Sequence, residues 1–178
     1  MRGSRRRWLL GTREDRLALE FIHSTLAELE LLRGRPEAAI ARLEPLAGRE
    51  GGFRALIENT LAWALMEAGE ETRAGELAGE TAARGRAEGE RLGLVDALRV
   101  QGMVLTRQGN ANEAATILEE ALVLARSLPY PYAEARILAE LDRLEEALAI
   151  FQRLGARKDI ERTEQELAAL EPTADPAR

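Results

Sequence analysis

Residues 102–126 read GMVLTRQGNANEAATILEEALVLAR, and their spacing decides the fold. Gly109 separates two stretches of helical apolar periodicity, and Ala114 follows it five residues later. A glycine just past a helix can adopt the left-handed conformation that ends the helix, and a short linker then reverses the chain. The stretch therefore predicts a helical hairpin, with the small side chain of Ala114 where the second helix crosses the first.

The same spacing recurs along the whole chain. A helix-ending residue stands at Gly34, Gly69, Gly109 and Asp142, and an alanine follows each one at Ala39, Ala74, Ala114 and Ala147. Self-similarity at a period of this length is typical of helical repeat proteins. We predict first helices near residues 13–33, 53–68, 93–108 and 131–141, and second helices near 36–47, 71–91, 111–127 and 142–154. Leucines expected on the buried stripe of the first helices are Leu26, Leu61, Leu105 and Leu138.

The two ends of the chain differ from this repeat. A ninth helix near residues 157–170 has a mostly charged surface and is expected to cap the array, because the end units of a solenoid need a polar outer face. Residues 1–12 form a basic N-terminal arm or the remnant of a preceding repeat, and residues 171–178 a disordered tail. The repeat domain is thus predicted to span residues 13–170.

Composition agrees with an all-α protein and excludes several function classes. Hydrophobic residues make up 46% of the 178 residues but aromatic residues only 4%, which favours helices over sheets. The net charge of -6 opposes direct nucleic-acid binding outside the basic residues 1–7. The chain has no cysteine, so a disulfide framework and a thiolate nucleophile are excluded. No apolar stretch is long enough to span a membrane, and we expect a cytoplasmic protein.

The spacing of small and large residues in 102–121 resembles the tetratricopeptide repeat, which has a small residue at its position 8, glycine at 15 and alanines at 20 and 27. Residues 111–136 and 145–170 are similar to the MalT-like repeat regions of bacterial LuxR-type regulators and signal-transduction ATPases. The resemblance implies a right-handed superhelix of about four hairpins with a C-terminal capping helix. The fourth unit departs from the pattern, since it has Pro131 in place of an aromatic residue and Asp142 in place of the turn glycine.

Catalytic machinery is not expected. The phosphate-binding pattern GxxxxGK[ST] is absent, and a lone His23 cannot form the usual zinc constellation. His23 either packs in the core or has a functional role, and packing is the simpler interpretation. Gly75, Gly79, Gly85 and Gly89 form either a hinge or close-packing seam, or a weak helix that tertiary packing carries. We expect neither a cofactor nor a metal ion.

The resemblance also implies a partner-binding groove, because the first helices of a tetratricopeptide array line its concave surface. The residues placed there by register are Phe21, Glu28, Asn59, Trp63, Met66, Arg99, Met103, Arg107, Tyr132 and Arg136. Aromatic residues, methionine and arginine dominate the energetics of protein interfaces. The alternative interpretation of Trp63 and Met66 is that they pack against the next repeat.

These observations predict a protein-interaction scaffold that binds a protein or peptide in the groove, in bacterial signalling or transcriptional regulation. An apolar peptide with an acidic element facing the arginines would suit the groove. The alternative is a ligand-sensing module in which a small effector occupies the groove and shifts the conformation. The sequence does not fix the oligomeric state, and a homo-oligomer is compatible with it.

Overall fold

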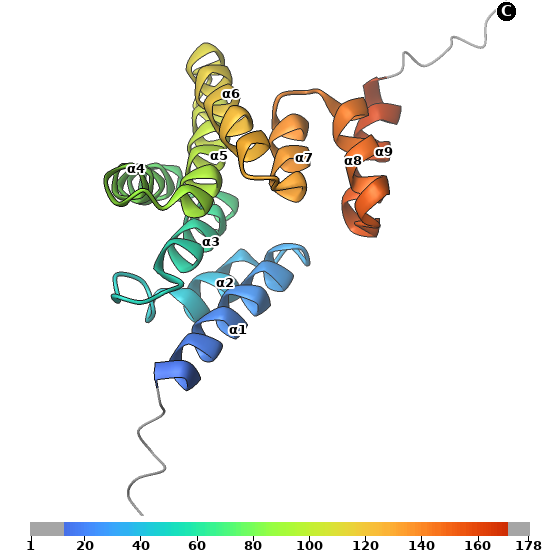
Figure 1. Ribbon diagram of the computed structural model, residues 1–178. Helices are drawn as coiled ribbons and strands as arrows, with labels where there is room; N and C mark the ends of the chain where they lie inside the picture. The colour runs from blue at the N-terminus through green and yellow to red at the C-terminus, as the bar shows by residue number, and fades with distance from the viewer. Residues whose placement is uncertain (1–12, 171–178) are drawn as a thin grey trace, which may run out of the picture. The chain divides into compact units, whose positions relative to one another are not determined.

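The computed structural model describes residues 13–170, and every regular element within them is an α-helix (Figure 1). The prediction of an all-α fold is thereby confirmed. The helices are α1 (Arg13–Leu31), α2 (Pro36–Leu43), α3 (Arg54–Glu67), α4 (Glu71–Glu88), α5 (Arg91–Arg107), α6 (Ala111–Ser127), α7 (Pro131–Glu140), α8 (Leu144–Leu154) and α9 (Arg157–Leu170). The predicted N-terminal arm and C-terminal tail lie outside the described residues.

Contacts among the helices gather into two units, one ending at Gly89 and one beginning at Glu90. In the first unit, α1 packs on α2 and α3, and α3 packs on α4. In the second unit, α5 packs on α6 and α7, α7 on α8, and α8 on α9. Each unit therefore contains two hairpins. That residues 13–170 form one repeat domain stays a prediction.

The four turns inside the hairpins have the same backbone geometry. The residue at each predicted helix end has a positive φ, as in Gly109 at 79° and Asp142 at 57°. The N–H of Gly109 donates to Thr106 O, and the N–H of the next residue, Asn110, donates to Leu105 O. The equivalent pair of bonds occurs after Gly34, Gly69 and Asp142. This is the Schellman arrangement, which satisfies helix-terminal carbonyl groups and reverses the chain.

Small buried side chains mark the contact between the two helices of each hairpin. The alanines five residues after the turns, Ala39, Ala74, Ala114 and Ala147, are all buried. Seven residues before the turns lie further small residues, namely Ala27, Ala62, Gly102 and Ala135, and these are buried as well. A Cβ atom added to Gly102 would lie 2.5 Å from Leu118 Cγ, so α5 and α6 approach closely at this point. The prediction that the repeated alanines face the interior is confirmed.

The structure corrects two details of the prediction. Helix α2 ends at Leu43 rather than near residue 47, because Pro45 has no N–H to continue the hydrogen-bond ladder. The chain then closes a turn with Leu46 N–H donating to Leu43 O, and Gly48 at φ 72° ends it. Leu26, expected on the buried stripe, is instead exposed on α1. The buried position beside it belongs to Ala27, because α2 and α3 cover the other side of the helix.

Candidate functional site

Five of the predicted site residues lie on two neighbouring helices of the second unit. Helix α5 carries Arg99, Met103 and Arg107 at spacings of four, and α7 carries Tyr132 and Arg136 at the same spacing. A spacing of four places side chains on one side of a helix. Since α5 packs on α7, the two rows lie on neighbouring elements. We call the surface formed by these five residues the α5–α7 face.

Arg99 joins the two helices of this face. Its Nη1 atom donates to Glu140 Oε1 on α7 at 3.3 Å and to Met103 Sδ at 2.8 Å. The side chain of Arg99 is 4% exposed, whereas that of Glu140 is 30% exposed. A guanidinium removed from water needs such partners, because an uncompensated buried charge is costly. Arg99 therefore holds α5 against α7, and its burial leaves little surface for the acidic partner group predicted from the sequence.

Of the other four residues, Arg107 is exposed and Met103, Tyr132 and Arg136 are half-buried. The guanidinium carbon of Arg136 lies over the Tyr132 ring at 5.6 Å from its centroid, within range of a cation–π interaction. The same ring meets Phe151 edge-on with centroids 6.1 Å apart, and the hydroxyl donates to Asp159 Oδ2 at 3.2 Å. The contacts with α8 and α9 thus hold the Tyr132 ring in one orientation, and Arg136 packs on the ring so held.

In the first unit the predicted residues are spread over α1 and α3. Phe21 is 51% exposed and its ring contacts that of Phe53 with centroids 5.6 Å apart. Trp63 is half-buried, and its Nε1–H donates to Glu67 Oε1 at 3.2 Å. Glu28 is half-buried on α1. These side chains are partly accessible, and they come from two helices that pack on each other.

Two further predicted site residues lie in the interior of the first unit. Met66 is fully buried and Asn59 is 5% exposed, so neither presents the surface that a partner contact requires. The burial of Met66 indicates a packing role inside the first unit. Helix α3 is enclosed by α1, α2 and α4, so eight of its fourteen residues are buried. Repeat register identifies a side of the helix, but it does not reveal how much of that side the neighbouring helices cover.

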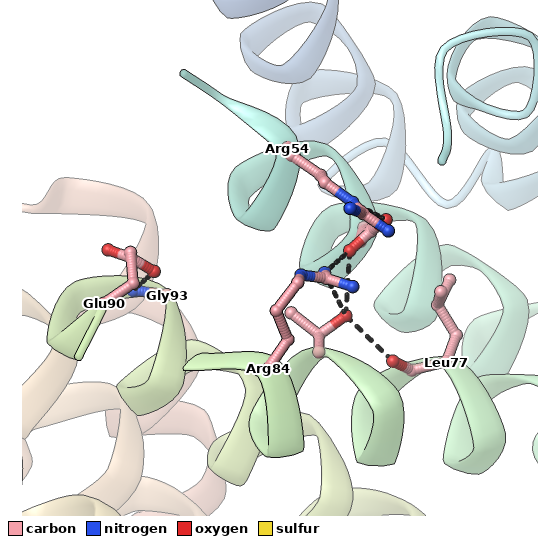
Figure 2. Close-up of polar contacts among 7 residues, drawn as sticks. Arg54, Leu77, Arg84, Glu90 and Gly93 are labelled. Carbon is pink, nitrogen blue, oxygen red and sulfur yellow. Dashed lines mark hydrogen bonds and ion pairs between the residues drawn. The ribbon is translucent and has the colours of Figure 1, made fainter. Parts of the chain in front are cut away.

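The strongest polar cluster of the first unit was missed by the sequence analysis. Glu58 on α3 is 3% exposed and accepts a hydrogen bond from Arg54 Nε at 2.9 Å. Arg84 on α4 forms a close ion pair with its other carboxylate oxygen, to which Thr81 Oγ1 donates at 3.2 Å. Figure 2 shows Arg54 and Arg84 reaching toward this carboxylate from the two helices. The only sequence signal is the i,i+4 spacing of Arg54 and Glu58, which is equally typical of a solvated helix face.

The Glu58 cluster fastens α3 to α4 and shows no sign of catalytic use. Burial lowers the pKa of Arg84, and the nearby charge of Arg54 lowers it further, while Glu88 acts in the opposite direction. Arginine keeps its charge throughout the ordinary pH range in spite of such a shift. With two cations around one carboxylate, the cluster has no free base to offer a substrate.

The other candidates for chemistry remain isolated. His23 is half-buried on α1, and its Nδ1 atom has no hydrogen-bond partner among the described residues. In the part of the chain that the structure describes, no group of three or more His, Cys, Asp or Glu side chains could hold a metal ion. None of the helices in residues 13–170 has the length and apolar character to cross a membrane.

An open hollow of about 600 Å³ lies in the second unit, away from the α5–α7 face. Its lining comes from the start of α8 and the end of α9: Asp142, Arg143, Leu144, Glu145, Glu146, Leu167 and Leu170. Arg143 Nε donates to Glu146 Oε1 at 2.7 Å, and this bond lowers the pKa of the Glu146 carboxyl. This ion pair lies on the rim beside apolar leucine side chains, and none of the predicted site residues belongs to the lining.

A search against protein-family models finds no match to this sequence. A comparison with curated proteins finds no match either.

Proposed function

We propose that this chain is a tetratricopeptide-type repeat scaffold that binds another protein through the α5–α7 face of its second unit. The repeated Schellman turns and the buried small residues at both equivalent positions of the four hairpins support this classification. The resemblance to MalT-like repeat regions further suggests a role in bacterial signalling or transcriptional regulation. The right-handed superhelix that the resemblance implies belongs to the same proposal.

The observation that carries the proposal is the Tyr132–Arg136 pair. A tyrosine ring held from behind by Phe151 and Asp159 loses little side-chain entropy when a partner binds. The guanidinium stacked on that ring offers hydrogen-bond donors in a plane suited to a carboxylate. Tyrosine and arginine are also enriched among the residues that dominate binding energy. The partner that fits is an apolar peptide or helix with an acidic side chain.

The test compares partner capture by the wild-type chain and two variants. Each chain is immobilised and exposed to lysate of the native host, and the retained proteins are identified by mass spectrometry. We expect Tyr132→Ala and Arg136→Glu each to lose a protein that the wild-type chain retains. The matched control is Arg153→Glu, which makes the same charge change at an exposed site on α8. If both variants and the control retain the same proteins as the wild type, the α5–α7 face is not the binding surface.

The second candidate function is a ligand-sensing module, in which a small effector binds and shifts the conformation. The hollow between the start of α8 and the end of α9 favours it, since its volume lies within the range of small-molecule sites. Its lining mixes charged and apolar side chains and is open to solvent, so it would enclose a ligand less completely than a closed pocket. A thermal-shift screen of small metabolites separates the scaffold from the sensor. A metabolite that stabilises the wild-type chain but not Arg143→Ala would favour the sensor.

A further inference from the structure

Helix α1 has an apolar outer face and a partly polar inner one. Its inward residues are Glu20, Ser24, Ala27 and Leu31, all buried. On the opposite side lie four large apolar residues: Leu19 at 55% exposure, Ile22 at 48%, Leu26 at 38% and Leu29 at 42%. We call these four residues the α1 seam. Their exposed surface is on the order of a few hundred Å², comparable with the largest apolar patch of a typical soluble monomer, which is often functional.

The spacing of the α1 seam indicates what covers it. Its members follow one another at intervals of three, four and three residues. This is the a/d pattern with which one helix packs along another in a coiled coil. The seam lies on the side of α1 that faces away from α2 and α3, its neighbours in the unit. Another helix can therefore lie along it without displacing α2 or α3.

The charges beside the seam favour a second copy in antiparallel orientation. When two α1 helices pack antiparallel about a two-fold axis, Leu19 of one copy lies opposite Leu29 of the other, and Ile22 opposite Leu26. The flanking e positions are Arg16, His23 and Glu30. Antiparallel packing then brings Arg16 of each copy close to Glu30 of the other. A parallel pair would instead set e residues against the uncharged g residues Ala18, Thr25 and Leu32, so it would gain no ion pair.

Glu30 is able to take part in such a pair. Its Oε2 atom forms an ion pair with Arg35 Nη2 of the same chain at 2.6 Å, and its side chain is 16% exposed. A carboxylate has room for more than one donor, so Arg16 of a second copy can share it with Arg35. Arg16 itself is exposed.

We propose that the chain forms a homodimer through the α1 seam, with the two α1 helices antiparallel. The interface is isologous, so every contact is made twice. This surface lies in the first unit and is independent of the proposed function, which depends on the second. With few apolar residues from each copy, the dimer is expected to dissociate on dilution rather than to be obligate.

Sedimentation velocity of the full chain over a range of concentrations tests the proposal. We expect a monomer–dimer equilibrium for the wild type, and a dissociation constant about 100-fold higher for Leu26→Glu, because each copy loses about a factor of ten. The matched control is Val123→Glu on α6, which introduces the same charge at a site that is 67% exposed, and it should dimerise like the wild type. A wild-type chain that stays monomeric, or a Leu26→Glu chain that dimerises normally, would overturn the proposal.

A charge-exchange experiment tests the antiparallel orientation. Arg16→Glu and Glu30→Arg should each weaken self-association by about tenfold, since each places two like-charge pairs in the dimer. An equimolar mixture of the two variants should recover association, because both pairs of the mixed dimer then join opposite charges. Circular dichroism checks that Glu30→Arg remains folded, and Arg16→Glu carries the test at an exposed position. A mixture that associates no better than the single variants would contradict the antiparallel dimer.

Discussion

At the scale of the residue, Glu58 shows how a single buried carboxylate specifies a hairpin. Its carboxylate binds Arg54 of its own helix and Arg84 and Thr81 of α4, and the residue is only 3% exposed. A buried ion pair adds little net stability over an apolar pair of the same shape, but removal of one partner leaves the others without compensation. The cluster therefore acts mainly to fix how α3 lies against α4.

We predict that Glu58→Ala lowers the free energy of unfolding by about 2 kcal/mol. This loss is smaller than that expected on breaking a fully buried ion pair, because Arg54 and Arg84 keep some access to water. Denaturant unfolding followed by circular dichroism measures this difference. Glu80→Ala, which removes an exposed carboxylate from α4, is the control and should change stability by no more than about 0.5 kcal/mol. Equal effects at the two sites would mean that the Glu58 cluster contributes nothing specific.

Asp142 is the second residue with a distinct physical role. It occupies the turn position that glycine holds in the other three hairpins, with a φ of 57°. A side chain in this left-handed conformation carries a strain that glycine does not. We predict that Asp142→Gly stabilises the chain by about 0.5–1 kcal/mol, measured as a rise in the midpoint of chemical unfolding.

The reverse change provides the comparison for Asp142. Gly109→Asp should destabilise the chain by a similar amount, since a Cβ atom at Gly109 meets nothing within 4 Å and the cost is purely conformational. A stabilising Gly109→Asp would refute this explanation of the turn.

At the scale of the element, close packing between paired helices depends on small residues at defined positions. Gly102 illustrates the limit, because a Cβ atom there would lie 2.5 Å from Cγ and 2.6 Å from Cδ2 of Leu118. Leu118 is buried on α6 and has little room to move. The backbone of α5 thus approaches the α6 side chain more closely than an alanine would allow.

We predict that Gly102→Ala destabilises the chain by about 1 kcal/mol. Overpacking costs about 1–3 kcal/mol, and the better helix propensity of alanine offsets about 1 kcal/mol of it. In a Leu118→Ala background the clash is absent, so the same substitution should stabilise the chain by about 1 kcal/mol. A double-mutant cycle by denaturant unfolding measures the change of sign, and its absence would show that Leu118 does not limit the approach.

At the scale of the whole molecule, burial is unevenly distributed among the described helices. Helices α3 and α5 each bury eight residues, whereas α9 buries only Thr163. Local opening requires little energy where few apolar contacts are lost. The described region therefore combines the well-packed helices α3 and α5 with a weakly held C-terminal helix α9.

We predict that hydrogen exchange measured by mass spectrometry is slowest in α3 and α5 and fastest in α9 among the nine described helices. Phe151→Ala removes a fully buried side chain from α8, the helix that packs on both α7 and α9. The variant should therefore raise hydrogen exchange in α7 and α8 while leaving exchange in α3 unchanged. Uniform exchange across all nine helices would contradict this order.

The sequence by itself determined the helices, their turns and the inward position of the repeated alanines. These features are local, because a glycine or aspartate in the left-handed conformation ends a helix regardless of what surrounds it. The predicted helix ends agree with the structure to within two residues except at α2, which Pro45 ends early, and at α4, which ends at Glu88 with Gly89 as its left-handed cap rather than near residue 91.

Only the tertiary structure decided which side chains remain open to a partner. Register placed Met66 and Arg99 on the same kind of helix face as Tyr132 and Arg136, yet neighbouring helices cover the first two and leave the others half-exposed. The burial of Glu58 and the exposure of Leu26 were likewise beyond the sequence. Helical periodicity fixes the direction of a side chain about its own axis, whereas burial depends on how many other helices pack around that axis.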